Sequence, residues 1–204
     1  MLNKKTKIAV FVSGGGTNLQ AILESEKRGE IPDGEIALVL SNNPNAYALE
    51  RAKNFGVKAV CIDKAVYKTL EEREEKAIEV LQENGIELIV LAGYLSILSE
   101  NFTKKYARRI INVHPSLIPS FCGKGFYGLK VHEEALKYGV KVTGATVHFV
   151  NEIPDGGEII MQKAVCIEDG DTPEVLQKRV MREAEWIILP QSVQKIAKLL
   201  KEKL

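Results

Sequence analysis

An amide and an imidazole two residues apart, Asn112 and His114, are the side chains in this sequence best suited to chemistry. They follow the apolar pair Ile110-Ile111, which indicates a strand, and side chains two residues apart on a strand share a face. Pro115 cannot donate to a sheet ladder, so we expect the strand to end there. A hydrogen-bond donor for an oxyanion beside a group that titrates near neutrality is what acyl transfer requires. The structural alternative is a histidine that satisfies a buried strand end.

A glycine-rich segment, Ser13-Gly14-Gly15-Gly16-Thr17-Asn18, is the second candidate site. It lies between a predicted strand (7–13) and a predicted helix (18–28). Glycines let the backbone approach a ligand closely, and a helix N-terminus offers free N–H groups and the positive end of a dipole. These features suit a phosphate monoester, although neither a Walker A loop nor the GxGxxG pattern matches. The alternative is a flexible turn with Asn18 as the helix cap.

Three other titratable residues depend on how the chain folds. Asp155, in Pro154-Asp155-Gly156-Gly157, reads as a turn residue unless that turn folds back over His114. A carboxylate there would raise the proton affinity of the imidazole and fix its orientation. We expect His148 to be a structural strand residue and His132 to be solvated on a charged helix.

Composition excludes several classes of protein. The 204 residues suit one α/β domain, and 28 basic against 27 acidic residues give a formal net charge of +1, which indicates neither a nucleic-acid-binding nor a membrane-surface protein. The N-terminal apolar run is too short to span a membrane and lacks a cleavage site, so we expect a cytoplasmic protein. The three cysteines have neither disulfide nor zinc spacing, and no metal is expected. We expect Cys61 and Cys166 in the core and Cys122 exposed; a Cys122 nucleophile is a further alternative.

Strand and helix patterns alternate as βαβαβαβαβ up to residue 113, which predicts a doubly wound, mainly parallel sheet. The predicted strands are 7–13, 35–41, 57–62, 88–92 and 109–113, and the predicted helices are 18–28, 46–54, 69–84 and 97–106. A loop (115–128), a helix (129–138) and two strands (144–150, 158–166) follow. The last helix, 172–203, starts after Thr172, and Pro190 should kink or interrupt it. No linker is evident, so 1–204 is predicted as one domain with a C-terminal β-β-α part.

Five segments in order give the sequence a family resemblance: 13–20, Leu91-Ala92-Gly93-Tyr94, 112–117, 144–150 and Asp155-Gly156-Gly157. The chain resembles the phosphoribosylglycinamide formyltransferases of purine synthesis over nearly its whole length. The resemblance implies a Rossmann-like fold and transfer of a formyl group from 10-formyltetrahydrofolate to the amine of glycinamide ribonucleotide. It also implies a phosphosubstrate-binding half (1–113) and a folate-binding, catalytic half (114–204), with no metal.

By this resemblance the catalytic residues are Asn112, His114 and Asp155. Asn112 and a protonated His114 would stabilise the oxyanion of a tetrahedral intermediate, and Asp155 would keep His114 charged and help to move the proton. The phosphosubstrate would contact Gly15, Gly16, Thr17, Asn18 and Glu185, with the acidic Glu185 near the glycinamide amine. The folate would contact Lys68, Tyr94, Leu95, Ser96, Ile97, Leu98, Asn112 and Val150.

The chain departs from the family pattern at two places. Leu95-Ser96 stands where some members have Met-Arg, and the loop 121–128 is longer than in others. Rival hypotheses are a formyltetrahydrofolate hydrolase or another folate formyltransferase with the same trio, and a non-catalytic phosphosugar-binding module. A methionyl-tRNA formyltransferase would need a tRNA-binding tail for which 204 residues leave no room. The sequence leaves a homodimer open, and we expect Trp186 in the core.

Overall fold

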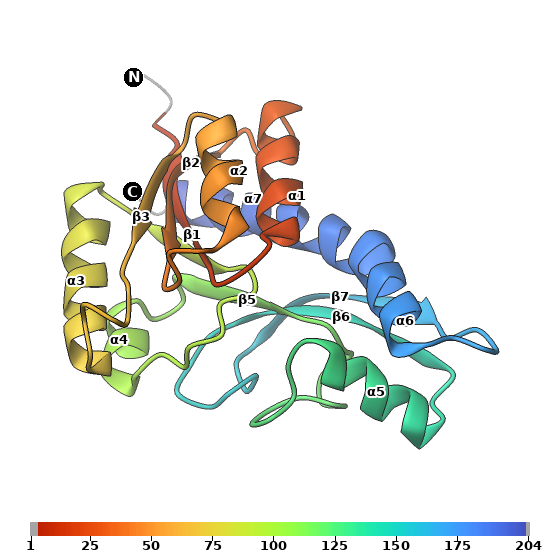
Figure 1. Ribbon diagram of the computed structural model, residues 1–204. Helices are drawn as coiled ribbons and strands as arrows, with labels where there is room; N and C mark the ends of the chain where they lie inside the picture. Colours follow the sequence, from red (N-terminus) through yellow and green to blue (C-terminus); the bar gives the residue numbers. More distant parts are fainter. Residues whose placement is uncertain (1–3, 203–204) are drawn as a thin grey trace.

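Seven strands form one sheet in the order β3-β2-β1-β4-β5-β6-β7, in a computed structural model that describes residues 4–202 (Figure 1). The strands are β1 Thr6–Val12, β2 Gly34–Ser41, β3 Lys58–Cys61, β4 Leu88–Leu91, β5 Ile110–His114, β6 Val142–Phe149 and β7 Ile159–Cys166. Neighbours among β1 to β5 pair in parallel, whereas β6 pairs antiparallel with both β5 and β7. The prediction of a doubly wound, mainly parallel sheet is confirmed.

Helices cover both faces of this sheet (Figure 1). They are α1 Thr17–Lys27, α2 Tyr47–Asn54, α3 Leu70–Glu83, α4 Glu100–Lys105, α5 Leu129–Tyr138, α6 Pro173–Val180 and α7 Trp186–Lys201. Alternate residues of β1 serve two separate apolar clusters: Ile8 and Val10 pack with residues of α1 and α7, and Ala9 and Phe11 pack with residues of α3 and α4. A strand buried on both faces is apolar throughout, which explains the continuous apolar runs in the sequence.

The C-terminal helix is irregular at a different place from the one predicted. Thr172 caps α6 as expected, but α7 continues through Pro190. The irregular turn is instead a π-helical segment, Met181–Glu185, directly before α7. Proline has no N–H to donate to the carbonyl four residues before it, here that of Trp186. The missing hydrogen bond therefore lies in the first turn of α7 rather than in its middle. Wide turns of this kind are frequent at functional sites.

Three burial predictions were wrong. Cys166 is exposed because β7 is an edge strand, and Trp186 is 37% exposed. His132 is fully buried because it shares a helix face with the buried residues Val131 and Ala135. Cys61, expected in the core, and Cys122, expected to be exposed, are both half-buried, so these two expectations do not hold either. The helices within residues 4–202 include none long and apolar enough to cross a membrane.

Candidate active site

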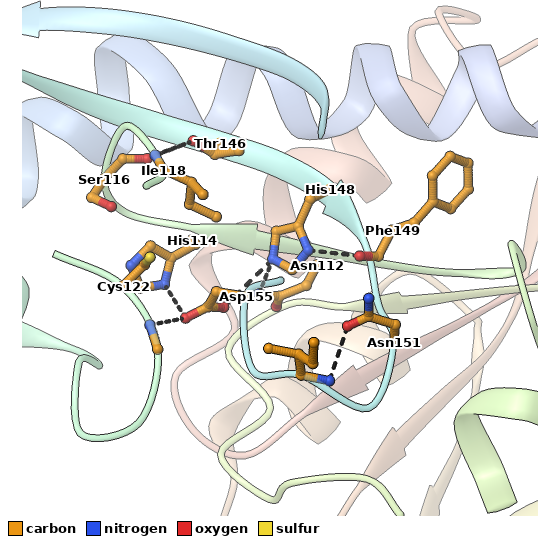
Figure 2. A network of polar contacts seen from close by, with 12 residues as sticks. Asn112, His114, Ser116, Ile118, Cys122, Thr146, His148, Phe149, Asn151 and Asp155 are labelled. Atoms are coloured by element: carbon orange, nitrogen blue, oxygen red, sulfur yellow. Dashed lines mark hydrogen bonds and ion pairs between the residues drawn. The ribbon is translucent and has the colours of Figure 1, made fainter. Parts of the chain in front are cut away.

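The antiparallel pairing of β5 with β6 assembles the centre of the candidate site. Its register places Asn112 opposite His148 and His114 opposite Thr146. Directly opposed residues on antiparallel strands have neighbouring side chains. The amide Nδ2 of Asn112 lies 3.2 Å from Nε2 of His148 (Figure 2). The predicted common face of Asn112 and His114 therefore carries a second imidazole.

His114 is 4% exposed and held from two sides. Its Nε2 lies 2.9 Å from the carbonyl oxygen of Phe121, which can only accept, so Nε2 carries the proton of the neutral ring. Its Nδ1 lies 3.5 Å from Oδ2 of Asp155. The loop 115–128 thus fixes the tautomer of His114 and leaves the Nδ1 lone pair facing the carboxylate.

Asp155 shows that the β6–β7 turn folds back over His114, as the catalytic hypothesis required. The turn gives Asp155 a φ of 56°, and the backbone N–H of Gly123 donates to Oδ2 at 2.8 Å. A Cβ on Gly157 would lie 1.7 Å from the carbonyl oxygen of Phe149, so only glycine lets the turn approach the end of β6 this closely. A turn residue by sequence becomes part of the site through this fold-back.

His148 is the site residue that sequence reasoning assigned to a structural role. Its Nδ1 donates to the carbonyl of Phe149 at 2.7 Å, which leaves Nε2 to accept from Asn112. The same Nε2 lies 3.5 Å from Oδ1 of Asp155, so the carboxylate sits between two imidazoles (Figure 2). The alternation of Gly144, Thr146 and His148 on one face was the available signal, but only the antiparallel register brings that face to Asn112.

Burial and charge act in opposite directions at this centre. Burial lowers the pKa of the His114 imidazole, and although Asp155 and the Phe121 carbonyl oppose it, the pKa stays below its ordinary value. The structure therefore favours a neutral ring at pH 7, contrary to the expectation that Asp155 keeps His114 charged. Burial raises the pKa of Asp155, but the contact with His148, the His114 ring and the Gly123 N–H outweigh it, so the carboxyl is ionised.

The glycine-rich segment lies at the carboxyl end of β1, where it opens α1. Gly16 has a φ of 72°, and a Cβ there would lie 2.6 Å from Cβ of Ala48. The first intrahelical bond runs from the N–H of Gln20 to the carbonyl of Gly16, so the N–H groups of the residues before Gln20 have no partner within the helix. Asn18 forms no side-chain cap bond; its Nδ2 donates to Oε2 of Glu185 at 2.6 Å instead.

Glu185, at the end of the π-helical turn, is 5% exposed. Burial raises the pKa of its carboxyl to about 6, and the hydrogen bond from Asn18 only partly opposes this. Asn18 Oδ1 is also buried and has no partner within the described residues. The structure thus brings two of the predicted substrate contacts together across 167 positions of sequence.

The predicted folate contacts divide into two groups. Tyr94, Leu98 and Val150 pack against one apolar cluster under the β4–α4 loop, whereas Leu95 and Ile97 are 68% and 66% exposed. Ser96 accepts from Nδ2 of Asn42 at 2.8 Å. Lys68 is exposed just before α3, and its carbonyl accepts from Arg73.

Two cavities of the structure are lined by other residues than those of the centre. One of about 230 Å³ is lined by α4 residues and the 149–158 segment, including Val150. The other, of about 380 Å³, lies along α1 and is lined by Thr17, Arg51 and Trp186 among others. Cys122 donates to the carbonyl of Pro119 at 3.3 Å, and burial raises the pKa of its thiol, which argues against an activated thiolate. Within residues 4–202 no cluster of His, Cys, Asp and Glu could hold a metal ion.

Comparison with known proteins identifies relatives across nearly the whole chain. The pattern of the family described as "Formyl transferase" matches residues 6–193. A trifunctional purine biosynthetic protein of Gallus gallus is 44% identical over 95% of this chain, which spans 18% of the length of that protein. A phosphoribosylglycinamide formyltransferase of Haemophilus influenzae is 43% identical over 90% of this chain and 84% of its own length.

A solved structure agrees with these sequence relatives. Glycinamide ribonucleotide transformylase 1 of Symbiobacterium toebii superimposes with a TM-score of 0.89 at 40% identity, covering 97% of this chain and 90% of that one. The sheet with its one antiparallel strand, β6, and the long last helix therefore form an architecture that this chain shares with that solved protein.

Proposed function

The chain belongs to the formyl transferase family, and from that premise we propose that it transfers the formyl group of 10-formyltetrahydrofolate to the amine of glycinamide ribonucleotide. The observation that carries the proposal is the assembly of Asn112, His114, His148 and Asp155 at one strand end. Formyl transfer needs an oxyanion donor and a proton carrier in one place, and these residues supply both.

Asn112 is the proposed oxyanion donor. One Nδ2 hydrogen is directed at Nε2 of His148, which orients the amide and leaves the second hydrogen for the oxygen of the formyl group. As the amine attacks the formyl carbon, this oxygen gains negative charge, and a pre-oriented donor stabilises it without further reorganisation.

His114 and Asp155 are the proposed proton carriers. Attack gives the amine nitrogen a positive charge, and the neutral Nδ1 of His114 can accept one of the protons on that nitrogen, directly or through water. Asp155 stabilises the resulting imidazolium from 3.5 Å. The proton then goes to the folate nitrogen as its bond to the formyl carbon breaks, so that neither a metal nor a covalent enzyme intermediate takes part.

The ribonucleotide phosphate is proposed to bind the N–H groups of Gly15 to Asn18. Glu185, held by Asn18, is proposed to contact the remainder of the ribonucleotide. The folate ring is proposed to lie against the Tyr94–Leu98 segment and Val150. A homodimer and a cytoplasmic location remain predictions.

Folate absorbance, followed with and without glycinamide ribonucleotide, tests the proposal. Folate release that depends on the ribonucleotide is expected. Release without any acceptor would point to a hydrolase with the same residues. No release in either mixture would favour a phosphosugar-binding module, in which the β5–β6 centre has no catalytic role.

A further inference from the structure

The segment 43–51 donates hydrogen bonds to three consecutive backbone carbonyls of the glycine loop. Nδ2 of Asn43 donates to the carbonyl of Ser13 at 3.1 Å. The backbone N–H of Ala48 donates to the carbonyl of Gly14 at 3.1 Å. Nε of Arg51 donates to the carbonyl of Gly15 at 2.8 Å. All three donors belong to the β2–α2 connection or to α2 itself.

This bonding fixes where the N–H groups of the loop point. In a planar trans peptide, the C=O and the following N–H point in opposite directions. The carbonyls of Gly14 and Gly15 face α2, so the N–H groups of Gly15 and Gly16 face away from it. Successive N–H groups directed outward in this way form an anion-binding concavity.

Arg51 is the charged member of this arrangement. Its Nη1 donates to Oε1 of Gln20 at 3.0 Å, and its guanidinium lies 5.0 Å from the centre of the Tyr47 ring. Among the described residues the arginines in ion pairs are Arg28, Arg108, Arg179 and Arg182. Arg51 is not one of them, so its charge is not neutralised by a carboxylate.

We propose that Arg51 is a positioning residue for the phosphate subsite: by holding the Gly15 carbonyl, it sets the Gly15–Gly16 peptide so that the Gly16 N–H faces the substrate phosphate. This inference rests on the proposed function, because it deepens the phosphate subsite. The planar guanidinium, fixed by two hydrogen bonds, gives that peptide one orientation and adds a positive charge within the field of a dianion. Arg51 thereby makes the enzyme selective for the phosphorylated over the dephosphorylated acceptor.

The test measures formyl transfer to glycinamide ribonucleotide and to the ribonucleoside that lacks the phosphate. Arg51→Ala is expected to raise KM for the ribonucleotide about 10- to 100-fold, the range for one hydrogen bond to a charged group. The kcat and the KM for the folate should change little, and transfer to the ribonucleoside should be unaffected. Arg51→Lys, which keeps the charge but lacks the planar guanidinium, should recover only part of the loss.

Arg28→Ala is the matched control. Arg28 lines the same α1 cavity, but it pairs with Glu30 rather than with the loop, so its loss should leave both acceptors unaffected. If Arg51→Ala preferred the ribonucleotide as strongly as the unchanged enzyme does, the inference would be overturned. If the Ala variant melts at a lower temperature, the Lys variant is used instead to test whether the preference for the ribonucleotide depends on Arg51.

Inorganic phosphate, titrated by calorimetry, separates this inference from the proposed function. Binding to the unchanged protein that is weakened in Arg51→Ala supports the role of Arg51, even if formyl transfer is absent. Equal binding to both proteins counts against it, even if transfer is present. If the unchanged enzyme used the ribonucleotide and the ribonucleoside equally well, the proposal of a phosphate subsite would be wrong. The proposed role of Arg51 would then be wrong as well.

Discussion

The glycine loop and the β5–β6 centre lie at the same edge of the sheet, yet they are held in different ways. Both follow the carboxyl ends of parallel strands, β1 and β5, where open α/β sheets bind ligands. The loop is shaped through its own backbone carbonyls, bonded to Asn43, Ala48 and Arg51. The centre is assembled from side chains of separate segments. The loop, which is the proposed binding end, is therefore a preset backbone surface. The centre, which is the proposed catalytic end, depends on the orientation of individual side chains.

Two carboxyls, the buried Glu185 and the half-buried Asp155, show the same contrast. At the binding end, Glu185 has one amide partner, and burial raises its pKa to about 6. At the catalytic end, Asp155 lies between two imidazoles and accepts a backbone N–H, and its pKa falls below the ordinary value despite burial. The partners of Asp155 outweigh its burial, and this keeps an ionised carboxylate beside the proposed proton carrier, whereas the single amide partner of Glu185 does not offset its deeper burial.

Loss of the proposed oxyanion donor, Asn112, should give the largest effect on the rate and should affect only the catalytic end. Asn112→Ala is expected to lower kcat by about 10²- to 10³-fold, as for removal of one oxyanion-hole donor. Steady-state kinetics checks this, with Asn101→Ala, an exposed asparagine on α4, as the control. A near-normal kcat in Asn112→Ala would contradict the assignment.

Asp155→Asn tests the charge at the catalytic end. We expect kcat to fall by about 10²-fold with KM values nearly unchanged, the size of a general acid–base contribution. Because ionised Asp155 raises the His114 pKa, its neutral replacement should shift the acidic limb of the pH–rate profile to lower pH. Asp169→Asn, in an exposed turn, is the control. A change confined to KM would make Asp155 a binding residue.

Glu185→Gln tests the carboxyl at the binding end through stability. A folded-state pKa of about 6, above the ordinary 4.5, means that protonated Glu185 stabilises the fold below pH 4.5 and that this stability is lost as the pH rises through 6. The loss is about 2 kcal/mol in the unfolding free energy. Urea unfolding at pH 4.5 and 7.5 should show this loss of unfolding free energy in the unchanged protein and not in Glu185→Gln. The control Glu183→Gln, a change at an exposed neighbouring residue, should show the same loss as the unchanged protein.

His148→Leu should have the smallest effect, because His148 acts through its neighbours. Losing the contacts to Asn112 and Asp155 is expected to lower kcat about 10-fold, the cost of one hydrogen bond. His148→Gln retains a polar group and should recover part of the rate. Stopped-flow folate absorbance measures both variants, and equal rates in Leu and Gln variants would show that His148 only fills space.

The sequence by itself determined the features that repeat over short distances. Apolar runs and amphipathic spacing located the strands and most helices, and the Thr69 capping box starts α3 where predicted. Helix α4, by contrast, is capped by Ser99 and begins at Glu100, three residues after the predicted start at residue 97. The glycine loop, the common face of Asn112 and His114, and the end of β5 before Pro115 follow from local geometry.

Only the tertiary structure decided which distant residues meet. The antiparallel register of β6 brings His148 to Asn112, the β6–β7 turn brings Asp155 to His114, and the π-helical turn brings Glu185 to Asn18. Arg51 carries no sequence signal, because its role depends on the side of the glycine loop against which α2 packs. Local patterns fix backbone conformation over a few residues. Strand register and helix packing are set by the whole core at once, and these contacts decide the chemistry.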